Sequence, residues 1–131
     1  MVVRNRRTVG LTYRADQWAG KKAGTEALAA VRGWGYASLD PNDLETAVRL
    51  LVDAVVKDGG KRISVHLGDQ DQKVLVIVLS HLAATASEDA LLSQLAALRS
   101  VESCGTDASD DGRRVWALLD AAPSPGRPAA A

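Results

Sequence analysis

The sequence predicts an α+β fold, a two-layer α/β sandwich in which helices cover one face of a mostly antiparallel sheet. Three observations predict it. Residues 40–58 carry apolar side chains at helical spacing between clear start and stop signals. Residues 62–67 and 73–80 have the composition of two strands joined by a short polar turn. The predicted elements follow one another as β-α-α-β-β-α-β-β, so the helices fall between groups of strands.

The first strand is predicted over residues 8–13, where apolar residues alternate with small or polar ones. The helix after it is predicted from an N-cap at Asp16 to about Arg32, ahead of a segment with two glycines. Its apolar side is expected to comprise Trp18, Ala27, Leu28 and Val31. Because tryptophans are most often buried, we expect Trp18, Trp34 and Trp116 to be core residues.

The second helix has the strongest signals in the chain. Asp40 can cap it, Pro41 suits the first helical position, and Asp43 lies near the positive end of the helix dipole. Gly59 and Gly60 end it. One apolar stripe at helical spacing consists of Leu44, Ala47, Val48, Leu51, Val52 and Val55.

The rest of the chain predicts a central strand over 73–80, since that run is continuously apolar. A helix follows over 88–99, with Ser87 as its N-cap, and then two strands over 101–106 and 113–119. In domain terms, the prediction is a basic N-terminal arm (1–7), a single domain (8–120) and a disordered tail rich in Pro and Ala (121–131).

Composition predicts an ordinary globular protein. The chain has 131 residues, with 16 basic and 16 acidic side chains, so no global charge favours a polyanionic partner. Cys104 is the single cysteine, which excludes an intrachain disulfide and favours a reducing compartment. The longest strongly apolar run, residues 74–79, is too short to cross a bilayer. We therefore expect a cytoplasmic protein. The two histidines, His66 and His81, do not have the spacing of metal ligands.

The charge is unevenly distributed. Residues 1–22 contain six basic side chains and one acidic one, Asp16. We consider this segment the best candidate for contact with a partner, through Arg4, Arg6, Arg7, Lys21 and Lys22. The alternative is an ordinary solvated surface.

Four strings, in this order and spacing, carry a resemblance to a known family. They are Trp34-Gly35-Tyr36, the helix of residues 40–58 running into Gly59-Gly60, the strand 74–80, and Gly112-Arg113-Arg114-Val115-Trp116-Ala117-Leu118. Together they resemble the histidine-kinase-like ATPases, especially the anti-sigma-factor serine kinases of actinobacteria, over residues 8–120. The resemblance implies that family's fold. It also implies a homodimer formed through the N-terminal strand and first helix.

The resemblance places the family's chemical residues at positions that lack the chemistry. Its catalytic Glu corresponds to Leu50, its Mg²⁺-binding Asn to Ala54 and its adenine-binding Asp to Ser80. A basic residue or His usual in this branch corresponds to Asp58. The glycine-rich phosphate loop is replaced around residues 87–91, where two acidic side chains oppose a triphosphate. An offset of one residue would put Asp53 in the Asn position instead.

The expectation is therefore an ATPase-type fold without an ATP site, no catalytic residues, and no cofactor or metal. The leading interpretation is a non-catalytic regulatory protein that binds a sigma factor, an anti-anti-sigma protein or a related regulator. The alternative is an active serine kinase that binds ATP and Mg²⁺ in a divergent pocket. The third is a regulator that binds nucleic acid through its basic arm, against which the zero net charge counts. A Ser64-His66-Asp69 triad is rejected, since no nucleophile elbow surrounds Ser64.

Overall fold

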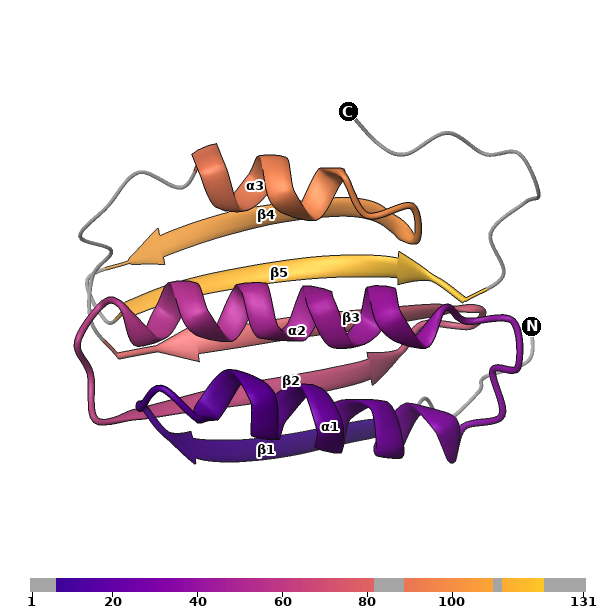
Figure 1. Cartoon of the computed structure of the whole chain (residues 1–131), viewed down its shortest axis with the longest axis horizontal. Coiled ribbons are helices and arrows are strands. Elements are labelled where there is room, and N and C mark those ends of the chain that lie inside the picture. The colour runs from indigo at the N-terminus through magenta and orange to yellow at the C-terminus, as the bar shows by residue number, and fades with distance from the viewer. Residues whose placement is uncertain (1–6, 82–88, 110–111, 122–131) are drawn as a thin grey trace.

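The computed structural model describes residues 7–81, 89–109 and 112–121. Five strands and three helices lie within these ranges, in the predicted order (Figure 1). Their bounds are β1 (Thr8–Arg14), α1 (Ala19–Arg32), α2 (Pro41–Val56), β2 (Arg62–Asp69), β3 (Lys73–Ser80), α3 (Asp89–Ala96), β4 (Val101–Ser109) and β5 (Gly112–Asp120).

The strands form one sheet in the order β1-β2-β3-β5-β4, and every neighbouring pair is antiparallel. The three helices lie on the same face of this sheet, so the predicted two-layer α+β architecture is confirmed (Figure 1). The strand β3 lies in the middle of the sheet, as its continuous apolar sequence predicts.

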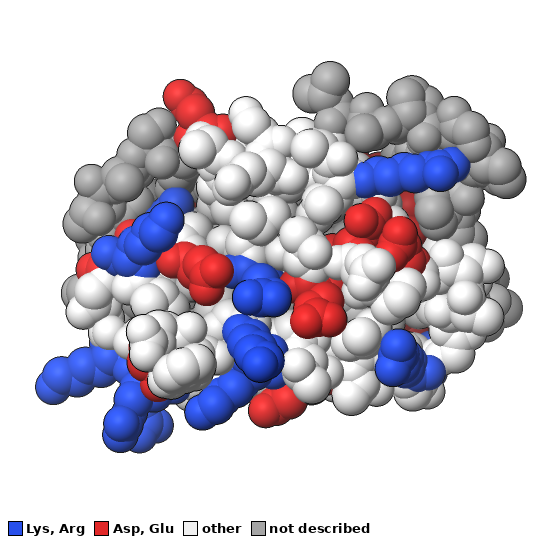
Figure 2. All heavy atoms as spheres, viewed as in Figure 1, with Lys and Arg blue, Asp and Glu red and all other residues white. Residues whose placement is uncertain are grey.

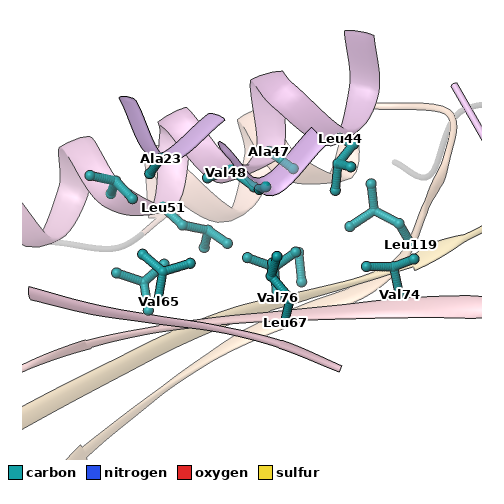
Figure 3. Packing of buried hydrophobic residues seen from close by; sticks show 14 of the residues in the cluster. Ala23, Leu44, Ala47, Val48, Leu51, Val65, Leu67, Val74, Val76 and Leu119 are labelled. Carbon is teal, nitrogen blue, oxygen red and sulfur yellow. The ribbon is translucent and has the colours of Figure 1, made fainter. Parts of the chain in front are cut away.

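The helix α2 forms the centre of the helical layer. The carboxylate of Asp40 accepts hydrogen bonds from the backbone N–H groups of Asn42 (2.9 Å) and Asp43 (3.3 Å), which confirms the predicted cap. All six residues of the predicted apolar stripe are fully buried. They pack onto the inward side chains of the sheet, among them Val65, Val76 and Leu119 (Figure 3).

The prediction for the start of α1 is wrong. The helix begins at Ala19, and Asp16 is not its N-cap, because its carboxylate accepts the N–H of Trp18 in the preceding turn. Trp18 does not belong to the core either, since it is 58% exposed. Ala27 and Val31 are buried as predicted, and the other residues that α1 buries are small: Ala19, Gly20, Ala23 and Gly24. Small side chains let α1 approach α2 closely, and a Cβ on Gly24 would lie 3.0 Å from Cγ of Glu45.

The hairpin between β2 and β3 is tighter than predicted, because Gly68 and Asp69 belong to β2. Two non-glycine residues with positive φ, Asp71 (59°) and Gln72 (68°), form its tip. Two consecutive residues of this kind define a type I′ turn, which matches the twist of the flanking strands. Such turns favour Asn-Gly, so this hairpin requires other contacts to hold it.

Two elements of the C-terminal half, α3 and β4, differ in length from the predictions. The helix α3 ends at Ala96 and not at Arg99, while β4 continues to Ser109. Ser87 and Glu88, the predicted start of this helix, lie outside the described residues, as does most of the predicted arm (1–6) and of the predicted tail (122–131).

Candidate functional site

A buried ion pair joins the end of α2 to the beginning of β5. Nη1 of Arg113 lies 3.1 Å from Oδ1 and 3.3 Å from Oδ2 of Asp58, and it also donates to the carbonyl oxygen of Ala54 at 3.4 Å. The side chains of Arg113 and Asp58 are only 4% and 2% exposed. Removing two charges from water costs several kcal/mol per ion, so the pair depends on its mutual attraction and these hydrogen bonds.

Local sequence explains why these groups meet. Asp58 follows Ala54 by four residues and lies in the turn just beyond α2, where its backbone N–H donates to the carbonyl oxygen of Val55. Arg113 stands opposite Ser80 in the antiparallel register of β3 and β5, and Ser80 is only 4% exposed. Ala54, Asp58 and Ser80, three positions assigned by the family resemblance, are therefore gathered around one arginine.

Gly112 makes the close contact between β3 and β5 possible at this point. It has φ of +147°, and a Cβ there would collide with the carbonyl oxygen of Ser80. A glycine is consequently required beside Arg113.

The other positions assigned by the resemblance are packed or turned outward. Leu50 is partly buried and, like Ala54, packs against the core. Asp53, the alternative to Ala54, is exposed and lies near Gly20 of α1. Leu91 at the start of α3 is buried. The partners of Arg113 among the assigned positions are thus the carbonyl oxygen of Ala54 and the paired carboxylate of Asp58.

The guanidinium of Arg113 is paired within the protein, and Leu50 can neither accept a proton nor orient water. A hollow of about 400 Å³ lies at the ends of the strands beside Arg113, lined by strand residues and His81 and by no residue of α2. Among the described residues, no group of three or more His, Cys, Asp or Glu side chains is placed to hold a metal ion.

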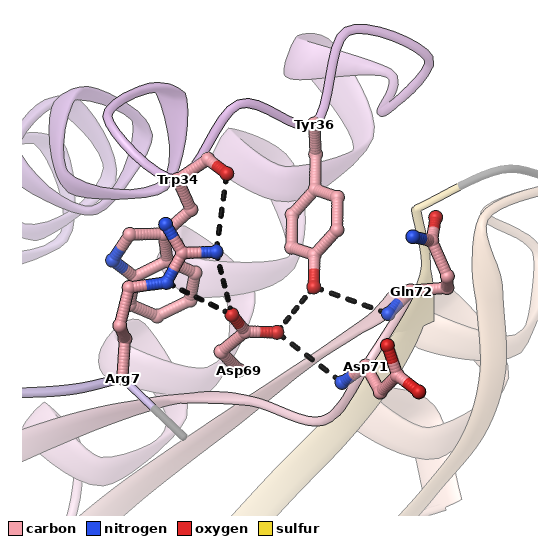
Figure 4. A network of polar contacts seen from close by, with 6 residues as sticks. All are labelled: Arg7, Trp34, Tyr36, Asp69, Asp71 and Gln72. Carbon is pink, nitrogen blue, oxygen red and sulfur yellow. Dashed lines mark hydrogen bonds and ion pairs between the residues drawn. The ribbon is translucent and has the colours of Figure 1, made fainter. Parts of the chain in front are cut away.

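A second polar cluster lies where β1 begins. We call the set Arg7, Trp34, Tyr36 and Asp69 the anchor cluster (Figure 4). Nε and Nη2 of Arg7 lie 3.0 Å and 2.7 Å from Oδ2 of Asp69, and Nη2 also donates to the carbonyl oxygen of Trp34. The guanidinium lies 5.6 Å from the centre of the Trp34 ring. The cluster ties β1 and the α1–α2 connection to the end of β2.

The anchor cluster also holds the strained hairpin. The hydroxyl of Tyr36 donates to Oδ1 of Asp69 and accepts the backbone N–H of Gln72 at 3.1 Å. The same carboxylate oxygen accepts the N–H of Asp71 at 3.2 Å. Both residues with positive φ therefore have their N–H groups bound by this cluster.

The electrostatics of the anchor cluster follow from these bonds. Burial alone would raise the pKa of Asp69, but the hydrogen bonds from Tyr36 and Arg7 outweigh it and lower that pKa below its ordinary value. Burial raises the pKa of Tyr36, and its hydrogen bond to Asp69 raises it further. Asp69 is thus held as a carboxylate and Tyr36 as a phenol at neutral pH.

The structure separates the residues that the sequence groups as partner contacts. Arg7 lies in the anchor cluster, whereas Lys21 and Lys22 lie in the first turn of α1, at the other end of β1. Arg4 and Arg6 are outside the described residues. Lys and Arg side chains gather where β1 ends and α1 begins (Figure 2). The exposed cations there, which we call the basic end, are Arg14, Lys21, Lys22, Lys61 and Arg62.

The register also places the rejected triad. Ser64 and His66 face away from the helices, while Asp69 has the opposite orientation in β2 and belongs to the anchor cluster. Sequence reasoning did not identify Arg113 as a functional residue. Its only signal in the sequence is that a basic residue directly follows the glycine of the last strand.

No protein-family model matches this chain, and no curated protein matches it significantly. Within the described part of the chain, none of the helices is long and apolar enough to cross a membrane.

Proposed function

We propose that this protein is a non-catalytic regulator that binds another protein, on a histidine-kinase-like ATPase scaffold that has lost its ATP site. The observation that supports it most is the buried pair of Arg113 and Asp58. If the resemblance is correct, this pair occupies the place where the family holds its nucleotide phosphates and metal.

The chemistry of the surrounding residues agrees with this proposal. Ala54 offers no side-chain ligand to Mg²⁺, and its carbonyl oxygen accepts a hydrogen bond from Arg113. A nucleotide would have to separate a buried ion pair before it could bind there, which would deprive two buried charges of their partners. ATP binding would therefore carry a penalty before any favourable contact is made.

We propose the basic end as the contact surface for the partner, in place of a continuous N-terminal segment. The basic end has five exposed cations, and Trp18, which directly precedes α1, exposes 58% of its surface. Such a surface attracts acidic partners and accelerates their association. By the family resemblance, the partner is a sigma factor, an anti-anti-sigma protein or a related regulator.

A pairwise binding assay tests this function. The purified chain would be combined with each purified sigma factor and anti-anti-sigma protein of its own genome, with and without Mg²⁺ and ATP. We expect one of them to bind in the absence of nucleotide, with an affinity that ATP leaves unchanged. Binding that requires ATP, or phosphorylation of the bound partner, would instead establish the serine kinase. Failure to bind any of them would exclude the partner class.

Charge reversal locates the contact surface in the same assay. The double change Lys21→Glu and Lys22→Glu should weaken partner binding about tenfold or more, mostly by slowing association at low salt. Arg32→Glu is the control for each single change, since Arg32 is also exposed and lies at the far end of the same helix. Equal weakening by both variants would contradict a localised surface.

A further inference from the structure

The end of β1 and the beginning of β2 lie together at one end of the sheet (Figure 1). A hollow of about 630 Å³ lies at this place, a volume within the range of small-molecule sites. Three of the residues that line it are cations and none is acidic. The lining residues, which we call the cationic hollow, are Thr12, Tyr13, Arg14, Ala15, Lys61 and Arg62.

Four polar side chains at this place belong to the face of the sheet opposite the helices. Thr12 and Arg14 alternate along β1 with residues that pack against the core, and Arg62 and Ser64 alternate along β2 with buried residues. The register of the two strands pairs Arg14 with Arg62 and Thr12 with Ser64. Neighbouring Cβ atoms of such a group are about 5 Å apart across the strands and about 7 Å apart along them. Two guanidinium groups and two hydroxyl groups are therefore neighbours.

The cations of the cationic hollow differ from the other cations of the sheet, because they have no carboxylate partner. The described strands carry five lysine and arginine side chains. Three of these form ion pairs with carboxylates: Lys73, Arg113 and Arg114. The other two are Arg14 and Arg62. Within the described part of the chain, neither of them forms an ion pair, and Lys61 beside them forms none.

The backbone holds these like charges next to each other. The N–H of Ala15 donates to the carbonyl oxygen of Lys61 at 2.9 Å, which extends the pairing of the two strands beyond Arg14. Like charges directly opposite each other on antiparallel strands destabilise a sheet. Asp16, the acidic residue closest to Arg14 in the sequence, does not line the hollow, and its carboxylate accepts the N–H of Trp18. An anion bound between the two guanidinium groups would replace their repulsion with two favourable pairings.

We propose that the cationic hollow binds a phosphate monoester, a compact group with up to two negative charges and three acceptor oxygens. A guanidinium group binds phosphate through two parallel N–H donors, and Arg14 and Arg62 each supply such a pair. Lys61 adds a third positive charge, and the hydroxyl of Thr12 adds a further donor. The volume of the hollow also leaves room for the group that carries the phosphate.

The other charges of this face favour a single phosphate over a strand of nucleic acid. A nucleic-acid strand requires cations that follow its backbone from one phosphate to the next. The other cations of the described strands on this face are Arg114 and Lys73, and they are already paired with Asp107 and Glu102. The cationic hollow overlaps the basic end, but this inference does not rest on the proposed function, because the isolated chain should bind the phosphate without a protein partner.

An NMR titration of the isotope-labelled full chain at pH 7 tests the site, with phosphoserine, inorganic phosphate and serine as probes. We expect phosphoserine to shift the amide signals of residues 12–15 and 61–64, with a Kd of about 1 mM or below, and serine to shift none of them. Equal affinity for inorganic phosphate would show that the free ion suffices, whereas tighter binding of phosphoserine would show that the carrier group is also contacted. Shifts that do not saturate, or that are spread over the cations of the whole surface, would overturn the proposal.

Two variants with the same change in charge locate the site, and their NMR spectra show directly that they fold. Arg62→Gln should raise the Kd for phosphoserine about tenfold, because one of the two paired guanidinium groups is lost. Arg114→Gln is the matched control, since Arg114 is also exposed on this face but is paired with Asp107, and it should leave the Kd unchanged. Equal weakening by both variants would contradict a localised site.

A single-stranded oligothymidine tests the nucleic-acid alternative in the same titration. We expect it to bind more weakly than phosphoserine at physiological salt, because its phosphodiesters carry one charge each and the neighbouring cations are paired. Tighter binding of the oligonucleotide, weakened by Arg114→Gln as well as by Arg62→Gln, would overturn the proposal in favour of a nucleic-acid surface.

Discussion

Arg113 on β5 and Asp58 beyond the end of α2 form an ion pair 3.1 Å long that the protein almost completely buries. The pair connects the helical layer to the sheet at the place where the family resemblance puts a nucleotide. Its charges neutralise each other, and its hydrogen bonds include the carbonyl oxygen of Ala54.

Breaking this pair from one side should destabilise the protein strongly. Arg113→Met leaves the carboxylate of Asp58 buried without its partner, and we expect the free energy of unfolding to fall by about 3–5 kcal/mol. The double change Asp58→Leu and Arg113→Met removes both charges and should recover most of the loss. Urea unfolding of the wild type, the single variant and the double variant measures both the loss and the recovery. A single-variant loss below about 1 kcal/mol would show that the pair is not buried in solution.

Stability should depend on pH through Asp69. Its pKa in the folded protein lies below the ordinary value of 3.8, so its contribution is fully present above that value. The contribution is lost as the pH falls through the lower, folded-state pKa. We expect Asp69→Asn to unfold more easily at pH 7, by about 2 kcal/mol, since hydrogen bonds to a charged group are lost. Its stability should also decline less below pH 4.

Asp107→Asn is the matched control for Asp69. Asp107 also pairs with an arginine, Arg114. The side chain of Asp107 is 58% exposed and that of Arg114 is 50% exposed. Exposed pairs of this kind contribute little. Urea unfolding between pH 3 and pH 7 should show the wild-type profile for Asp107→Asn. An identical profile for Asp69→Asn would contradict the role of the anchor cluster.

Gly112 should be the least replaceable of the glycines with positive φ. At Gly112, an alanine Cβ would collide with the Ser80 carbonyl oxygen in addition to the backbone strain. At Gly35, with φ of +84°, nothing lies within 4 Å of the added Cβ. Gly35→Ala should therefore cost only about 1–2 kcal/mol, the strain of a left-handed conformation. We expect a larger loss for Gly112→Ala in thermal unfolding. Equal losses would mean that β3 and β5 can separate at this point.

Sequence reasoning succeeded where local signals and tertiary packing agree. The cap and apolar stripe of α2 are confirmed, because Asp40, Pro41 and the periodic residues all favour the same helix. It was wrong at Asp16, whose carboxylate accepts a hydrogen bond in the turn before α1 and does not cap the helix. It was also wrong at Trp18, because tryptophans are usually buried and this one is exposed. Gly20 and Gly24 weaken a helix by propensity, yet they face α2, a role that only tertiary contacts reveal.

The candidate site could be predicted only in part. The sequence indicates which chemical groups are missing at Leu50 and Ala54, because a resemblance compares residue types position by position. It does not indicate what replaces them, since Arg113 and Asp58 are 55 residues apart and meet through the register of β3 and β5. Nor does it separate Arg7 from Lys21, which requires the direction of β1 to be known.

Thermal melting with millimolar Mg²⁺ and ATP tests the central claim most directly. At a hundredfold excess over the dissociation constant, a ligand stabilises the folded state by about 2.7 kcal/mol, which raises the melting temperature by several degrees. We predict no shift with ATP or ADP, because under the proposed function the buried pair of Arg113 and Asp58 occupies the position that the resemblance assigns to the nucleotide. A saturable shift of several degrees, abolished by Arg113→Met or not, would contradict the loss of the ATP site and favour the serine kinase.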